Sequence, residues 1–208
     1  MVETLSEQPT ISFWFSLICI NNCMRQYTAH DIEQFQNEYR DLITHIVVAH
    51  TLFRPFNKEQ PQIDRMAAQA KKDCRYGLNC FYKLLYPGAT NKPIRKPEIY
   101  KPLTFVTIEG AKENMGREQT IHFNIAFSNL PRILTREDIE VLFKHAWTTM
   151  AKQSDDVKVY DAKEYIKTNT WNGYSLKEAQ QQKDKAWRTD GIWDVDNCWI
   201  PHAAHNAD

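Results

Sequence analysis

Two short stretches decide the fold prediction: FVTIEG at residues 105–110 and IHFNIAF at residues 121–127. Both are rich in β-branched and aromatic residues, which is typical of buried β-strands. The residues between them, 110–119, contain glycine and many charges, which favours a loop. We therefore predict that Leu103–Glu109 and Thr120–Phe127 are strands that pair as an antiparallel hairpin.

The residues before this hairpin are predicted to be largely helical. Apolar residues recur at spacings of three and four between residues 31 and 53, so we expect an amphipathic helix there. A second helix is expected after Pro61, and Cys80–Tyr86 is a short apolar segment that Pro87-Gly88 ends. Residues 87–102 hold four prolines and four lysine or arginine residues, which indicates a basic, extended connector.

Further elements are predicted after the hairpin. Thr135 precedes two acidic residues, as expected for the N-cap and first turn of a helix. Val157–Tyr160 is a predicted strand, and a helix is expected over residues 174–187. Helices around a small antiparallel sheet make an α+β fold. We divide the chain into a largely helical N-terminal segment, a basic connector and a core with a C-terminal tail, at residues 1–86, 87–102 and 103–208.

Composition excludes several classes of protein. The 208 residues carry 26 basic and 26 acidic side chains, so no global positive field would coat DNA, although a local basic groove is compatible with this balance. Five cysteines without zinc-finger spacing indicate free thiols in a reducing cytoplasm. The apolar run Ile11–Ile20 is too short to span a bilayer and lacks signal-peptide features. We therefore expect a cytoplasmic protein with no membrane association.

Candidate metal ligands lie on the two predicted strands. Side chains two apart on a strand share a face, so His122 and Asn124 project together. If Glu109 lies on the paired strand, its carboxylate can meet them. An imidazole with oxygen donors suits Mg²⁺ or Mn²⁺. The alternative interpretation is that these polar residues form the solvated face of the sheet.

A tyrosine and a lysine on the last predicted helix are candidate catalytic residues. Tyr174 and Lys177 are three apart and share a helix face. A tyrosine phenol that attacks a DNA phosphate forms a covalent phosphotyrosine, and a nearby lysine stabilises charge on the phosphate or lowers the phenol pKa. Tyr160 and Lys163 repeat the pattern, and Tyr165 is a third phenol. We favour Tyr174, because Tyr160 and Lys163 would point to opposite faces of a strand.

The order of these motifs resembles the HUH endonuclease superfamily, which includes rolling-circle replication initiators, relaxases and related transposases. The match looks closest to replication initiators with a single catalytic tyrosine and covers about residues 103–185. One departure is that Asn124 stands where the family has its second histidine, although glutamine occurs there in some members. The matching segments are IEG at 108–110, HFN at 122–124, NLP at 129–131, Trp147 and YSLKE at 174–178.

The resemblance implies an HUH- or RRM-like sheet and a metal-dependent enzyme that nicks and joins single-stranded DNA. Glu109, His122 and Asn124 would hold Mn²⁺ or Mg²⁺. Tyr174 would form a 5′-phosphotyrosine, and Lys177 would assist at the phosphate or metal. The implied role is rolling-circle replication of a plasmid, phage or mobile element, with single-stranded DNA or an origin hairpin as substrate; transposition is a related possibility. A host helicase and polymerase would be required, because no helicase domain fits in 208 residues.

Aromatic and basic residues around Tyr174 are the candidate DNA contacts, because stacked bases and paired phosphates need this mixture. They are Trp171, Lys183, Lys185 and Arg188. The alternative is that the tryptophan is core and the basic residues solvate the helix; for Trp147 we predict a core position. Two other functions stay open: a noncatalytic DNA-binding module of the same fold with a degenerate metal site, and a structural protein in which the motifs are coincidental.

Overall fold

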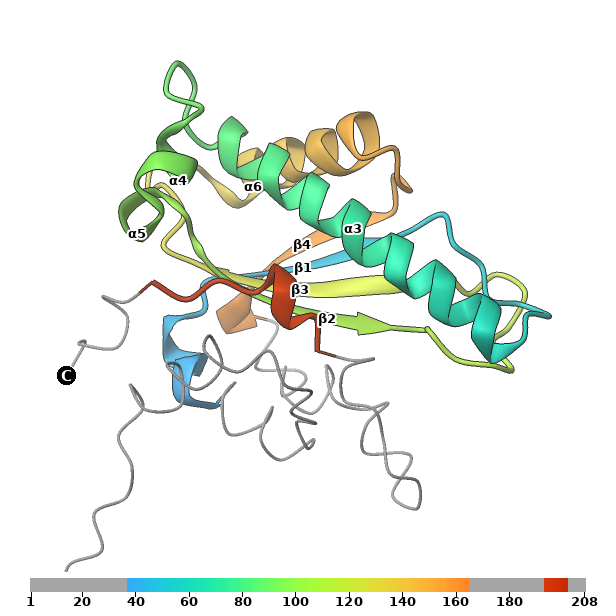
Figure 1. Ribbon diagram of the computed structural model, residues 1–208. Helices are drawn as coiled ribbons and strands as arrows, with labels where there is room; N and C mark the ends of the chain where they lie inside the picture. Colours follow the sequence, from blue (N-terminus) through green and yellow to red (C-terminus); the bar gives the residue numbers. More distant parts are fainter. Residues whose placement is uncertain (1–36, 165–192, 202–208) are drawn as a thin grey trace, which may run out of the picture.

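The described part of the protein is built on one four-stranded antiparallel sheet (Figure 1). The computed structural model describes residues 37–164 and 193–201. The strands are β1 (His45–His50), β2 (Leu103–Glu109), β3 (His122–Ser128) and β4 (Val157–Asp161), in the spatial order β2-β3-β1-β4. The predicted hairpin is confirmed, because β2 pairs with β3 in a register that places Glu109 opposite His122. The predicted strand at Val157–Tyr160 is confirmed as β4.

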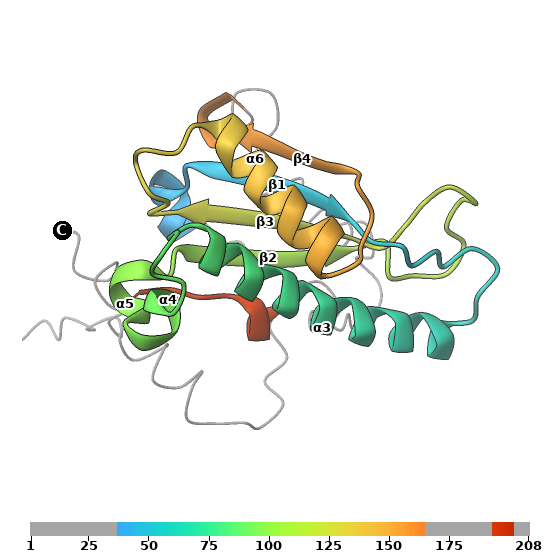
Figure 2. The same ribbon diagram turned by 90° about the horizontal axis from the view of Figure 1, so that it is seen from above.

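Two long helical segments cover one face of the sheet (Figures 1 and 2). They are α3 (Gln60–Leu84) and α6 (Arg136–Lys144), the latter continuing as a π-helix over His145–Met150. The ring centroids of Phe81 and Phe143 lie 5.2 Å apart in the layer between helices and sheet. The sheet residues in this core are all apolar: Val47, Ala49, Val106, Ile108, Phe123, Ile125, Phe127, Val157 and Val159. This arrangement is the predicted α+β class.

The sequence sets where α6 begins. Thr135 Oγ1 accepts a hydrogen bond from Asp138 N at 3.1 Å, and Asp138 Oδ2 accepts one from Thr135 N at 2.9 Å. This reciprocal capping box satisfies backbone donors that have no partner inside the helix. The prediction of Thr135 as the N-cap is therefore confirmed.

A glycine allows close packing between the two helical segments. A Cβ added to Gly77 on α3 would lie 3.0 Å from Cε3 of Trp147. Trp147 is fully buried, which confirms its predicted core position, and its Nε1 donates to the carbonyl oxygen of His50 at 2.8 Å. Trp147 thus joins the helical layer to the end of β1.

The opposite face of the sheet changes character along its length. At one end it is apolar, and the residues packed there include Tyr39, Ile43, Ile46, Phe105 and Ala126. At the other end, where β1 and β2 finish and β3 starts, it carries Glu109, His122 and Asn124. Because alternate residues of a strand face opposite sides, these polar groups point away from α3 and α6.

Residues 193–201 run along the edge of β2, and we call them the edge strap. Trp199 N donates to Thr104 O at 2.8 Å, and Thr104 N donates to Trp199 O at 2.7 Å. Asn197 Nδ2 donates to the carbonyl oxygen of Lys71 on α3 at 2.9 Å. The edge strap therefore pairs with a strand edge that would otherwise be available to other chains, and ties that edge to α3.

The helix predicted over residues 31–53 is wrong at its C-terminal end, where β1 lies. The apolar residues Ile46, Val47 and Val48 fit a helical spacing, but they are β-branched and consecutive. A central strand that is buried on both faces has this pattern. β1 and α3, from the N-terminal segment at residues 1–86, belong to the same sheet and core as β2 and β3.

Two other predictions need correction. Cys80–Leu84 is the last part of α3 and not a separate segment. The connector at residues 87–102 is not extended throughout, since it contains two short helical turns. A proline stands at one of the first two positions of each turn, where it is compatible with helical backbone. The short turns with defined bounds include η1 (Arg40–Leu42), α4 (Lys92–Arg95), α5 (Pro97–Tyr100) and η4 (Val195–Asn197). Among the described residues, no helix combines the length and apolarity needed to cross a membrane.

Candidate functional site

Three neighbouring strands bring their polar residues into one row at the end of the sheet. Glu109 on β2 lies opposite His122 on β3, and His122 lies opposite His50 on β1. Asn124 is two residues along β3 from His122 and shares its face. The two-residue alternation of side chains along the strands, together with the pairing of β2 and β3, therefore brings the three candidate ligands together, as expected from the sequence.

The carboxylate of Glu109 contacts both of its predicted partners. Glu109 Oε1 accepts a hydrogen bond from Asn124 Nδ2 at 2.8 Å, and Glu109 Oε2 lies 3.3 Å from His122 Nε2. The Glu109 side chain is 1% exposed, while that of His122 is 15% exposed. A carboxylate at this depth costs free energy unless charged or hydrogen-bonding groups surround it. We call Glu109, His122 and Asn124 the polar triad.

Asn124 is the residue that limits what the polar triad can hold. Its amide nitrogen faces Glu109, while its Oδ1 is buried without a hydrogen-bond partner in the described chain. A half-turn about the Cβ–Cγ bond of Asn124 exchanges the positions of its amide nitrogen and oxygen. A cation between Glu109 and Asn124 would favour the turned orientation, because a carboxylate, an imidazole and an amide oxygen are ligands for Mg²⁺ or Mn²⁺. The donor types therefore fit a divalent cation.

In the described ranges, no group of three or more His, Cys, Asp and Glu side chains is arranged to hold a metal ion. The polar triad has two residues of these types, and its third donor is the amide of Asn124. The candidate metal site thus depends on Asn124 acting as a ligand.

The structure adds His50, which the sequence prediction missed. Its ring stacks on that of His122, with centroids 4.8 Å apart and an interplanar angle of 21°. His50 Nδ1 is hydrogen-bonded to Thr120 Oγ1 at 2.8 Å, and His50 Nε2 lies 3.7 Å from Asp156 Oδ2. The ring that supports His122 is therefore itself fixed by two groups. The signal in the sequence was the β-branched run before His50, which indicates a strand.

The environment of His50 disfavours its charged form. Burial is the main cause that lowers the His50 pKa, and the neighbouring His122 lowers it further. Asp156 acts in the opposite direction, and Lys158 adds to the lowering. A neutral imidazole here stacks on His122 without adding positive charge beside a prospective cation.

The remaining candidates from the sequence are the proposed nucleophile with its lysine, the DNA contacts and a competing phenol. Tyr174, Lys177, Trp171, Lys183, Lys185 and Arg188 lie outside the described residues. The competing phenol, Tyr160, is on β4 opposite Ile46, while His50 at the other end of β1 faces His122. Lys163 lies in the helical turn that follows β4, and not on the strand as predicted. Because β1 lies between β4 and β3 in the sheet, Tyr160 is not adjacent to the polar triad.

Comparison of this chain with protein-family models, curated proteins and solved structures finds no match.

Proposed function

We propose that this protein is a metal-dependent enzyme that nicks and joins single-stranded DNA through a covalent 5′-phosphotyrosine. The observation that supports this best is the polar triad, in which one buried carboxylate contacts both an imidazole and an amide on the neighbouring strand. Three donor side chains that converge at one end of a sheet are suited to a cation that must also contact a substrate. We propose the HUH type of sheet on the same ground.

The polar triad would hold Mn²⁺ or Mg²⁺, and the bound cation would polarise the scissile phosphate. Glu109 would supply charge, His122 a neutral nitrogen and Asn124 an amide oxygen after its half-turn. The His122 side chain is more exposed than that of Glu109, so a phosphate would approach from the side of His122.

Tyr174 is the proposed nucleophile. Its phenolic oxygen would form a bond to phosphorus while the bond from phosphorus to the 3′ oxygen breaks, and the released 3′ oxygen would take up a proton. The phenol gives up its own proton in the same step. Lys177, three residues further along the chain, would stabilise charge on the phosphate. Attack by the 3′-hydroxyl on the phosphotyrosine reverses the reaction and joins the strand.

Trp171, Lys183, Lys185 and Arg188 are the proposed contacts to the DNA around Tyr174. An aromatic ring supports an unstacked base, and the cations pair with phosphates. The biological role we propose is initiation of rolling-circle replication of a plasmid, phage or other mobile element, with a host helicase and polymerase extending the free 3′ end.

The test is a search for the covalent adduct. The protein is incubated with pooled single-stranded oligonucleotides that include candidate origin hairpins, with Mn²⁺, and separated on a denaturing gel. A nuclease-sensitive shifted band is expected for wild type and for Tyr160→Phe, and not for Tyr174→Phe. Loss of the band in Tyr160→Phe alone would keep the enzyme class and overturn the choice of nucleophile.

One observation favours a second candidate function, a noncatalytic DNA-binding module of the same fold. Asn124 Nδ2 donates a hydrogen bond to Glu109 Oε1 at 2.8 Å, so a neighbouring amide satisfies this carboxylate oxygen. In that case DNA binding would be unaffected by a chelator, and no variant or wild-type protein would form the adduct.

A further inference from the structure

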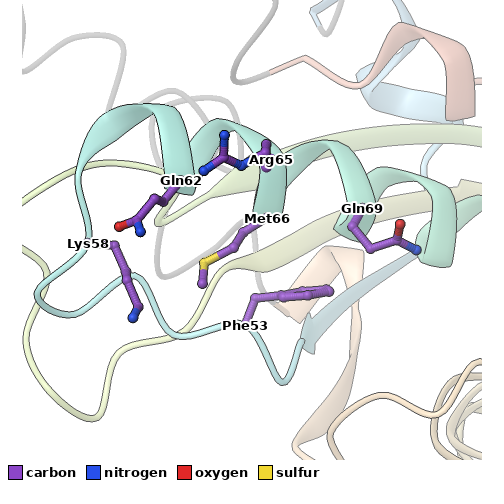
Figure 3. A pocket seen from close by; sticks show the side chains of 6 residues that line it. All are labelled: Phe53, Lys58, Gln62, Arg65, Met66 and Gln69. Carbon is purple, nitrogen blue, oxygen red and sulfur yellow. The ribbon is translucent and has the colours of Figure 1, made fainter.

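A groove lies on the helical side of the sheet, at the end that carries the polar triad (Figure 3). α3 begins at this end, where β1 and β2 finish. The groove has a volume of about 330 Å³. Its lining residues are Phe53, Lys58, Gln62, Arg65, Met66 and Gln69. It is therefore on the other face of the sheet from Glu109, but at the same end.

The groove combines an apolar floor with cations. Figure 3 shows Met66 on α3 facing Phe53, which belongs to the segment after β1. Both side chains are half-buried, whereas Lys58 and Arg65 are exposed. Neither cation forms an ion pair with a described residue, and no carboxylate is among the lining residues. The groove thus offers one aromatic face and two positive charges to a ligand.

Short hydrogen bonds connect the groove to the polar triad. Phe53 O accepts from Ile121 N at 3.0 Å, and Ile121 directly precedes His122. Thr51 Oγ1 donates to Ile121 O at 2.7 Å and accepts from Phe53 N at 3.1 Å. The backbone that positions Phe53 is therefore bonded to the start of β3, and the two sites have a fixed relation.

We propose that this groove binds single-stranded DNA that flanks the scissile phosphate, an inference that rests on the proposed function. One base would stack on Phe53 and Met66, and Lys58 and Arg65 would each contact a phosphate. A planar base against an aromatic ring and cations along the backbone are the two means by which proteins hold single strands without sequence preference. A duplex keeps its bases inside, so its backbone would meet the two cations but leave Phe53 without a partner.

The test uses fluorescein-labelled dT30, with binding measured by fluorescence anisotropy in EDTA. The double variant Lys58→Gln/Arg65→Gln removes both groove cations. The matched control, Lys72→Gln/Lys83→Gln, removes two exposed cations from other turns of the same helix. We expect the groove variant to bind about tenfold more weakly at low salt. Its log–log salt slope should fall by about 1.4, since each single-strand phosphate contact contributes roughly 0.7.

A third variant, Phe53→Leu, keeps an apolar side chain but removes the aromatic face. We expect this variant to bind dT30 about fivefold more weakly, which corresponds to the lower end of the loss for one base stack. Its salt slope should be unchanged, because no cation is removed. Urea unfolding of each variant separates loss of binding from loss of folding. Equal losses in the groove and control pairs, an unchanged groove variant, or no dT30 binding by wild type would each overturn the inference.

These outcomes are independent of nicking, because EDTA removes divalent cations. Groove-dependent dT30 binding without any Tyr174 adduct would keep the groove and overturn the enzyme. A Tyr174 adduct with unaltered dT30 binding in the groove variant would do the reverse.

Discussion

The two faces of the sheet bury different kinds of side chain. The face under α3 and α6 is mostly apolar and packs against the rings of Phe81, Phe143 and Trp147, and its buried Thr104 is hydrogen-bonded to Tyr82 of α3. The opposite face buries Glu109 and Asn124 as deeply, each 1% exposed. Apolar burial stabilises a fold, whereas a buried carboxylate needs charged or hydrogen-bonding neighbours to offset its desolvation, and a buried amide oxygen without a partner lowers stability.

The apolar residues of the helical face stabilise the fold, whereas the polar triad is accommodated by it. An apolar replacement of the polar triad would remove these costs, so stability alone does not account for it. Local departures from the rules of burial are expected where a protein has a function to perform. Substitutions on the helical face should therefore change stability, and those at the polar triad should change ligand binding.

The largest effect is expected from Trp147→Ala on the helical face. The variant leaves a cavity beside Phe143 and loses the hydrogen bond to His50 O, so the free energy of unfolding should fall by about 3–5 kcal/mol. Urea denaturation followed by circular dichroism measures it. Ile133→Ala, at an 89% exposed residue, is the control and should change stability by less than about 0.5 kcal/mol. A similar loss in both variants would contradict the comparison.

The next effect concerns the edge strap, where Asp194 joins β2 through its N–H to Val106 O. Burial is the main cause that raises the Asp194 pKa to about 6 from 3.8. Lys71 and Arg75 on α3 act against the shift, and Asp196 adds to it.

Between these pH values the folded state binds a proton more tightly than the unfolded chain, so the contribution of Asp194 to stability falls as pH rises from about 4 to 6 and is then constant. Asp194→Asn should therefore raise the free energy of unfolding at pH 7 by up to about 3 kcal/mol. The difference from wild type should vanish near pH 4. Urea denaturation at the two pH values measures it, and a pH-independent difference would show that the Asp194 charge is not responsible.

At the polar triad, Glu109→Gln should reduce Mn²⁺ affinity by about 100-fold, since it replaces the only charged donor. Electron paramagnetic resonance of free Mn²⁺ measures the affinity, with Glu113→Gln in the loop before β3 as the control. The variant should unfold at nearly the wild-type urea concentration, because the side chain keeps its shape. Unchanged Mn²⁺ binding would remove the polar triad from consideration as a metal site.

The smallest effect is expected for His50, as a residue that positions His122. His50→Ala loses the ring that stacks on His122 and should weaken Mn²⁺ binding about tenfold. His50→Phe keeps a stacked ring and should recover most of the affinity. If Ala and Phe variants bind Mn²⁺ equally, the stack does not orient His122.

The hairpin and its polar triad could be predicted because both depend on a local period of two. Once Leu103–Glu109 and Thr120–Phe127 are strands joined by a loop, the side of His122 and Asn124 follows. The N-cap at Thr135 was also predictable because the interaction is local in the sequence: its partner Asp138 is three residues away.

β1 and His50 could not be predicted in this way. The partners of β1 are β3 and β4, which lie far along the chain, and a strand buried on both faces has no alternation of apolar and polar residues. Without β1 in the sheet, nothing in the sequence places His50 beside His122. The edge strap likewise depends on pairing with Thr104, far from it in the sequence.

The central position of β1 also has a consequence for synthesis. A ribosome completes β1 first, yet both of its neighbours in the sheet, β3 and β4, emerge much later. A nascent chain therefore carries an apolar strand with two vacant edges while α3 and β2 are still being made, the state in which chains associate with one another or with chaperones. The β2–β3 hairpin can form once β3 has emerged, whereas the sheet can be complete only after Asp161 has emerged.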